Sequence, residues 1–404
     1  MLKNRFQIAL KCREFSSQKA ALEQLWSYMA QTAGLAVQGL RASLSSVKAT
    51  AAALVLVAFL ILIGTPPAAA GLPPGNAIKD GRALLRYALP LQDEDIRDVQ
   101  SAIESTSDSL RAKRWSPILK NAKRADRILK LHERKIIDIA SVEAGRSQAE
   151  QIVQAIHTQI QALAAAAQEK DKPLASEERL KALKLIGTLE GYMVSKEDVT
   201  IPAEYADLPY LNGRATIEMR TEKGDLTLIV DGYNAPITAG NFVDLVQRGF
   251  YDGLPINRTE EFYIAQLGDP EGPEEGFVDP ATGEYRSIPL EIKLKGDDDP
   301  IYGFTLESLG LYQEETVLPF SAYGTLGMAR PGNDPDGGSS QFFFFLYEPE
   351  LTPAGSNLID GRYASFGYVV EGQATLENLK VGDRVIKAEV IEGLENLVEP
   401  ASLS

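Results

Sequence analysis

The sequence predicts an α+β protein of more than one domain, with an N-terminal four-helix bundle followed by a closed β-barrel. Apolar residues recur at helical spacing between about residues 80 and 195. From residue 213 onwards the pattern changes to short alternating runs separated by Gly and Pro turns, which is typical of strands. The chain has 404 residues and is 44% hydrophobic, so it can build more than one core.

The segment 1–70 is predicted to be an export signal that is removed from the mature protein. Residues 51–63 form an uncharged apolar run, shorter than the roughly 20 residues that a membrane-spanning helix needs. Lys48 precedes this run, and the three alanines at 68–70 follow it with the Ala-x-Ala pattern of a cleavage site. An uncleaved membrane anchor is the alternative. After cleavage, we expect only peripheral contact with a membrane.

Residues 78–195 are predicted to form the helical bundle, an interaction or regulatory domain. Ile96, Val99 and Ile103 repeat at helical spacing, as expected for a helix that buries one face. The stripe expected for the last helix consists of Leu180, Leu183, Ile186 and Leu189. Because short breaks separate the helices, an antiparallel arrangement is favoured.

The range 196–212 contains several prolines and is predicted to be a linker, and 213–397 is predicted to be the β domain. Many short strands with few helices favour a closed barrel. The expected strands lie at 214–220, 226–230, 262–267, 324–329, 341–347, 366–370 and 384–391. Residues 271–323 are acidic and rich in Gly and Pro in places, so we expect a large surface insertion there.

Composition excludes several kinds of chemistry. The formal net charge of −15 argues against binding nucleic acid through its phosphates. The only histidines, His132 and His157, fall in the helical part and are expected to be polar surface residues, so the β domain cannot hold a Ser-His-Asp triad. The only cysteine, Cys12, lies in the predicted signal, and no Cys or His cluster suggests zinc. We expect no metal and no cofactor.

The segment 256–270 is the most informative stretch of the β domain. The apolar stretch between Glu260-Glu261 and the Gly-Asp-Pro turn at 268–270 reads as a strand that carries Tyr263, Ile264 and Gln266, and Arg258 precedes it. Side chains two residues apart share one face of a strand, so Ile264 and Gln266 point together, and Tyr263 points away unless the chain bends. A guanidinium and an amide can bind peptide carbonyls, while apolar residues hold a ring. The segment therefore predicts a peptide-binding surface.

Several motifs, taken in order, resemble the cyclophilin family, and in particular the large thylakoid-lumen cyclophilins of plants and cyanobacteria. The resemblance covers about residues 213–397, and the helical part is also similar. The motifs are Phe250-Tyr251-Asp252-Gly253, Arg258, Tyr263-Ile264, Gln266 to Pro270, Gly327 to Arg330, Gly338 to Phe343, and Ile359 to Gly367. The resemblance implies an eight-stranded barrel and peptidyl-prolyl cis-trans isomerase activity.

The resemblance also implies roles for individual residues. Arg258 would be the catalytic arginine, donating a hydrogen bond to the prolyl nitrogen as the amide twists. The residues implied to bind the substrate are Tyr263, Ile264, Gln266, Ala329, Gln341, Phe343, Leu358 and Tyr363. The family needs neither a metal nor a cofactor, in agreement with the exclusions drawn from composition.

This chain departs from the family pattern at several positions. Glu260 and Glu261 stand where less charged residues are usual, and we expect them to pair with Arg258 and compete with the substrate. The other departures are Asn257 for histidine, Ile264 for methionine, Arg330 for asparagine, Leu358 for tryptophan and Tyr363 for histidine. We therefore expect weak isomerase activity and poor cyclosporin binding.

Two functions remain open. The first is a prolyl isomerase that folds exported or thylakoid proteins and supports photosystem II assembly. The alternative is a weak or inactive cyclophilin that acts as a peptide-binding chaperone or assembly factor, regulated by its helical domain. The expected partners are proline-containing segments of client proteins, with photosystem II subunits as candidates. The expected location is the thylakoid lumen, with the periplasm as the alternative.

Overall fold

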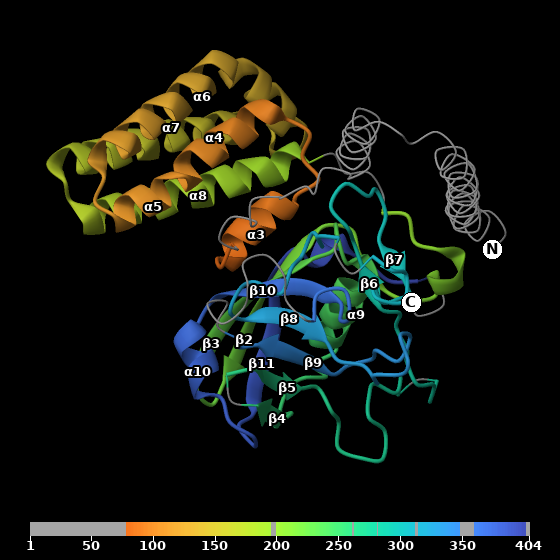
Figure 1. Ribbon diagram of the computed structural model, residues 1–404. Helices are drawn as coiled ribbons and strands as arrows, with labels where there is room; N and C mark the ends of the chain where they lie inside the picture. Colours follow the sequence, from red (N-terminus) through yellow and green to blue (C-terminus); the bar gives the residue numbers. More distant parts are fainter. Residues whose placement is uncertain are drawn as a thin grey trace, which may run out of the picture. The chain divides into compact units, whose positions relative to one another are not determined.

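The computed structural model describes residues 78–194, 199–260, 262–280, 282–311, 314–347 and 359–400 (Figure 1). The predicted signal 1–70, Glu261 and Leu358 lie outside these residues. Element labels follow Figure 1. Within the described ranges, none of the helices combines the length and the apolar character required to cross a membrane.

Six helices, rather than four, make up the described residues 78–194 of the helical part. They are α3 (Gly81–Ala88), α4 (Glu94–Glu104), α5 (Thr106–Arg111), α6 (Trp115–Ala144), α7 (Arg146–Glu169) and α8 (Lys172–Met193). Asp93 and Asp171 cap α4 and α8 by accepting the backbone N–H of Ile96 and Leu174, both at 3.0 Å. Lys170 ends α7 in the left-handed conformation, with φ of 59°.

The core of α4–α8 follows most of the predicted apolar periodicity. Ile96, Val99 and Ile103 are fully buried. Two expectations were wrong. Leu180 is 57% exposed, so it does not belong to the buried stripe of α8. His157 is buried rather than on the surface, and its Nδ1 lies 2.9 Å from Asp126 Oδ1.

Helix α3 packs with the β domain rather than only with the other helices. Leu84, Leu85 and Ala88 belong to the apolar core of the β domain. Arg214 Nη2 donates to the Leu85 carbonyl at 2.5 Å, and Asn234 Nδ2 donates to the Ala88 carbonyl at 2.9 Å. A truncation between the predicted helical and β domains would therefore expose part of the β-domain core.

The β domain is built on an antiparallel sheet of eight strands. They are β2 (Arg214–Thr221), β3 (Gly224–Asp231), β4 (Ile256–Glu260), β5 (Ile264–Leu267), β8 (Thr325–Met328), β9 (Phe342–Phe345), β10 (Ser365–Glu371) and β11 (Val385–Glu392). Their order is β11-β2-β3-β10-β8-β9-β5-β4. The edge strands β11 and β4 form no ladder with each other, and a bridge between Pro255 and Arg384 links their ends. The sheet is thus curled but open, and a closed barrel is not confirmed.

Shorter elements complete the β domain. Helix α9 (Pro236–Gln247) packs into the main core, with Phe242 fully buried, and α10 (Gln373–Asn378) follows β10. Two small sheets pair β1 (Tyr210–Leu211) with β12 (Leu397–Val398) and β6 (Glu291–Ile292) with β7 (Ile301–Tyr302). The short helices are η1 (Ala203–Tyr205) and η3 (Leu394–Asn396).

The stretch 271–323 is not simply the surface insertion that its composition suggested. Phe277, Leu290 and Leu318 from this stretch are buried in the main core. Arg286 is buried as well, and its Nη1 donates to Asp244 Oδ2 of α9 at 2.5 Å. These long-range contacts make part of the segment a structural layer of the β domain.

Candidate active site

The segment 256–270 contains a hairpin of β4 and β5, of which the sequence predicted β5 alone. Arg258 of β4 pairs with Gln266 of β5, and Glu260 pairs with Ile264. Between the strands, the chain turns at Phe262, whose φ of +59° is unusual for an aromatic residue, and whose side chain is 67% exposed. This bend is what brings the side chain of the neighbouring Tyr263 to the same pocket as Ile264 and Gln266.

An apolar cluster separate from the main core forms one wall of the site. Phe343 is buried at its centre, stacked on Phe320 with ring centroids 5.9 Å apart, and meets Tyr363 edge-on at 5.5 Å. The full cluster is Ile264, Phe320, Phe343, Phe345 and Ile359, with Tyr263, Ala329, Tyr347 and Tyr363 packed against it. Such a socket can hold a proline ring.

Gly327 gives the Phe343 ring its space. These two residues are register partners on β8 and β9. A Cβ at position 327 would lie 2.3 Å from Phe343 Cζ, far inside van der Waals contact. Any side chain at position 327 would therefore displace the Phe343 ring from its present place in the socket.

Amide groups form a polar wall beside this cluster, since Gln266 is the register partner of Phe343 on the neighbouring strand. Gln266 Nε2 donates to Gln341 Oε1 at 2.7 Å. Gln341 Nε2 in turn donates to the Glu275 carbonyl at 2.8 Å and lies 3.2 Å from Asp269 Oδ1. These contacts fix the orientation of both amides, so that they are pre-arranged to meet a peptide backbone.

All the predicted site residues that the structure describes line one pocket, with a volume of about 390 Å³. They are Arg258, Tyr263, Ile264, Gln266, Ala329, Gln341, Phe343 and Tyr363. Leu358, the remaining predicted residue, lies outside the described part of the chain. Among the described residues, none from 78–194 contributes to the lining. The roles assigned to these residues stay predictions.

The pocket also contains residues that were not among the predicted site residues. Glu275, Tyr285, Ser339 and Ile359 line it. The first two come from the stretch interpreted as a surface insertion, and no local pattern reveals that they reach the site. Ser339 and Ile359 could have been suspected, since both lie in the family motifs. Phe320, which supports Phe343, carries no sequence signal of this kind.

Arg258 forms an ion pair with Glu260, two residues further along β4. The Arg258 side chain is 59% exposed and the Glu260 side chain 41%. An ion pair in such an exposed position contributes about 0–1 kcal/mol, because water screens it and both side chains lose freedom. The guanidinium is thus held, but weakly. The expected ion pair between Arg258 and Glu260 is therefore present.

Arg330 is engaged at the far rim of the pocket. Its Nη2 donates to the Arg362 carbonyl at 2.6 Å, and its Nη1 donates to the Pro331 carbonyl at 2.9 Å. The guanidinium carbon lies 5.3 Å from the centre of the Tyr363 ring, within range of a cation–π contact. Burial lowers the pKa of Arg330 below its usual value. This arginine therefore braces the Tyr363 wall.

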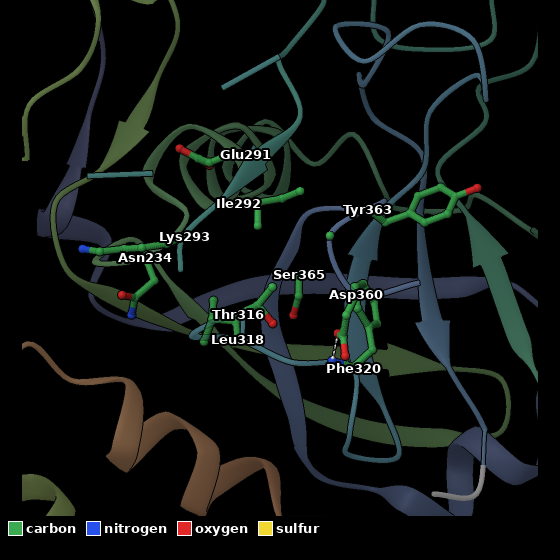
Figure 2. A pocket seen from close by; sticks show the side chains of 11 residues that line it. Asn234, Glu291, Ile292, Lys293, Thr316, Leu318, Phe320, Asp360, Tyr363 and Ser365 are labelled. Atoms are coloured by element: carbon green, nitrogen blue, oxygen red, sulfur yellow. Dashed lines mark hydrogen bonds between the residues drawn. The ribbon is translucent and has the colours of Figure 1, made fainter. Parts of the chain in front are cut away.

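A second, smaller cavity shares Phe320 and Tyr363 with the apolar cluster (Figure 2). Its volume is about 10 Å³, room for roughly one water molecule. Phe320 and Asp360 meet at its edge, where the Phe320 N–H donates to Asp360 Oδ1 at 2.8 Å (Figure 2). Glu291 also lines it, and its carboxylate accepts the backbone N–H of Ile237 and Thr238 at the start of α9, at 3.2 and 2.9 Å. Because the cavity is this small, we assign it to the packing of the β domain and not to substrate binding.

Comparison with protein families gives two matches along the chain. The cyclophilin type peptidyl-prolyl cis-trans isomerase family matches residues 216–395. The family described as peptidyl-prolyl cis-trans isomerase CYP38-like, PsbQ-like domain matches residues 80–194. The first match contains all the residues of the pocket, and the second spans α3–α8.

Individual proteins are similar over most of the chain. A Synechocystis protein named as a thylakoid lumen peptidyl-prolyl cis-trans isomerase is 51% identical over 364 residues, covering 89% of this chain and 96% of its own. The chloroplastic isomerase CYP38 of Arabidopsis thaliana is 42% identical, covering 81% and 77%. The chloroplastic CYP37 of the same plant is 30% identical, covering 81% and 72%. The chain therefore belongs to the cyclophilin-type peptidyl-prolyl cis-trans isomerases that carry an N-terminal PsbQ-like helical domain.

Proposed function

We propose that this chain catalyses cis/trans isomerisation of prolyl bonds in client proteins of the thylakoid lumen, and that Arg258 is its catalytic residue. The convergence of eight predicted residues on one pocket carries the proposal. The names of the similar proteins support the location, as does the match to a PsbQ-like domain. Photosystem II subunits are the clients that the family resemblance suggests.

Prolyl isomerisation requires the protein to position the substrate and to supply one hydrogen-bond donor at the prolyl nitrogen. The barrier to rotation about a peptide bond is about 18–20 kcal/mol, because twisting breaks the amide resonance. In the twisted state the prolyl nitrogen regains a lone pair, to which Arg258 can donate. A donor that meets the twisted amide better than either planar form lowers the barrier. A reduction of about 7 kcal/mol gives roughly a 10⁵-fold acceleration.

The two walls of the pocket suit the two parts of the substrate. The socket around Phe343 would hold the proline ring in place. Gln266 and Gln341, fixed by their mutual hydrogen bond, would hold the backbone next to it. With the ring and the backbone both held, rotation is confined to the prolyl bond itself, and Arg258, the register partner of Gln266, lines the same pocket.

A peptide-binding assembly factor is the second candidate function. The pairing of Arg258 with Glu260 favours it, because the substrate must compete with the carboxylate for the guanidinium. The weakness of an exposed pair argues that this competition reduces activity only a few-fold. We therefore place the isomerase first. The pocket lining offers no described residue of the helical part to support a cover over the groove.

One experiment separates the two candidates. NMR exchange spectroscopy on a short proline-containing peptide gives the isomerisation rate, and calorimetry gives the affinity, both with the full-length protein. We expect Arg258→Ala to lower kcat/KM by about 10²-fold, as for loss of a transition-state donor. Arg220→Ala is the matched control. The Arg220 side chain is 50% exposed and pairs with Glu389, and the two residues lie on β2 and β11 respectively, at the other end of the sheet from β4.

The outcomes are distinct. Equal rates for wild type and Arg258→Ala would refute the catalytic role of Arg258. Peptide binding without any acceleration by the wild type would favour the assembly factor. Loss of rate in Arg220→Ala as well would point to a general effect of removing a surface charge.

A further inference from the structure

Glu260 faces the pocket because of the geometry of its strand. Side chains alternate along a strand, so Arg258 and Glu260 project from the same face of β4. Glu260 pairs in register with Ile264, which belongs to the apolar socket. The carboxylate therefore lies beside the place where the proline ring is expected, and it lines the same pocket.

Among the charged residues of the pocket, Glu260 is distinguished by its direct pairing with Arg258. Among the described residues, four charged ones line the pocket: Arg258, Glu260, Glu275 and Arg330. Arg330 donates to three backbone carbonyls and stacks on Tyr363, so its guanidinium is already committed. Glu275 contributes its backbone carbonyl to hold Gln341. Glu260 is the carboxylate paired directly with the proposed catalytic group.

The weakness of this pair determines what it can do. An exposed ion pair changes an equilibrium by at most about fivefold, so Glu260 cannot switch the site off. A neutral peptide must release Arg258 from Glu260 without giving the carboxylate a new partner. A peptide with a cation beside its proline offers that partner. An anion there would instead compete for Arg258 and be repelled by Glu260.

We propose that Glu260 is a specificity-determining residue, which makes this site favour prolines flanked by lysine or arginine. The cation of the substrate pairs with Glu260, and Arg258 becomes free to donate to the prolyl nitrogen. This inference rests on the proposed isomerase function. It adds the class of substrate, namely basic proline-containing segments.

The test compares peptides that differ in one residue, with lysine, alanine or glutamate placed directly before or directly after the proline. Rates come from NMR exchange and affinities from calorimetry, with the full-length protein. For the wild type at low salt we expect kcat/KM to be about tenfold higher for the lysine than for the glutamate peptide, on at least one side of the proline. The preference should shrink in 0.5 M NaCl, because salt screens exposed charges.

The variant Glu260→Gln keeps the size of the side chain and removes its charge. We expect it to lose the preference for lysine and to turn over the alanine peptide up to about fivefold faster. Glu274→Gln is the matched control, because Glu274 is an exposed acid outside the pocket lining. It changes the net charge equally and should keep the wild-type preference.

Several results would overturn the inference. The first is an equal kcat/KM of the wild type for the lysine, alanine and glutamate peptides. The second is a preference for the lysine peptide that survives in Glu260→Gln. Either can occur while Arg258→Ala still abolishes catalysis, in which case the isomerase proposal stands. If the wild type accelerates no peptide, the affinities decide, since the lysine preference must then appear in binding. A wild type that binds none of the peptides overturns both proposals.

Discussion

The two faces of strand β9 carry the same residue type but belong to different regions. Phe342 and Phe344 point into the main core, where Phe342 meets Phe242 of α9 edge-on at 5.0 Å. Phe343 and Phe345 point the other way, into the apolar cluster of the site. One strand thus supplies both the structural core and the substrate socket. Because the period of a strand is two, neighbouring residues of identical chemistry can serve stability and function separately.

Truncation of a core-face ring should have the largest effect on stability. We expect Phe344→Ala to lower the free energy of unfolding by about 3–5 kcal/mol, because it leaves a cavity in a packed interior. The affinity for a proline peptide, measured at low temperature on folded protein, should change little. Chemical denaturation followed by near-UV circular dichroism measures the stability.

The site-face neighbour sharpens the contrast. Phe343→Ala should cost less stability, about 1–3 kcal/mol, because its ring borders an open pocket that can relax. Its kcat/KM should fall at least ~10-fold through loss of the ring contact in the socket. If Phe343→Ala and Phe344→Ala had the same effects on stability and rate, the two faces would not be functionally distinct.

Strand β6, outside the main sheet, contains a buried acid, Glu291, whose titration should be visible. Burial raises the pKa of Glu291 from 4.5 to about 7. Between these values the unfolded chain has lost the proton and the folded chain still holds it, so stability falls as pH rises, by up to about 1.4 kcal/mol per pH unit. Below pH 4.5 and well above pH 7 this contribution should be flat.

Unfolding free energies from pH 4 to 8 test this titration. We expect Glu291→Gln to be less stable overall, since one amide oxygen replaces two oxygens that accept the N–H of Ile237 and Thr238. The fall between pH 4.5 and 7 should be smaller in this variant. A slope that is unchanged in the variant would assign the titration to another group.

The smallest effect is expected at the hairpin of the site. Phe262 has a φ of +59°, which glycine adopts without strain and other residues at a cost. We expect Phe262→Gly to change stability by no more than about 1 kcal/mol, in the stabilising direction, with the relief of strain partly offset by the greater freedom of glycine in the unfolded chain. A clear destabilisation would mean that the exposed ring makes contacts important for the fold.

The same contrast explains which features the sequence could predict. The predicted strands agree with β2, β3, β5, β8, β9, β10 and β11, because alternation and turn residues are local signals there. The described site residues could be placed because the family motifs mark them one by one. The hairpin at 256–267 was missed because Glu260 and Phe262 carry no Gly or Pro signal of a turn.

Long-range contacts account for the other misses. His157 is buried because Asp126, on another helix, offers it a partner. The acidic stretch 271–323 enters the core because Arg286 finds Asp244 on α9. Neither partner is close enough in sequence to form a pattern. The number of helices was underestimated because α3 and α5 have 8 and 6 residues, too few to show a clear period.

We expect the site face of the sheet to bind the proline-containing segment and to catalyse isomerisation of its prolyl bond. The most direct test is TROSY NMR of the ¹⁵N-labelled full-length protein titrated with a proline-containing peptide. We predict that the largest shift changes lie at Arg258, Gln266, Ala329 and Gln341, with small changes in α4–α8 and at the core-face residues of β9. Shift changes concentrated in the helices, with the pocket residues unaffected, would contradict the account.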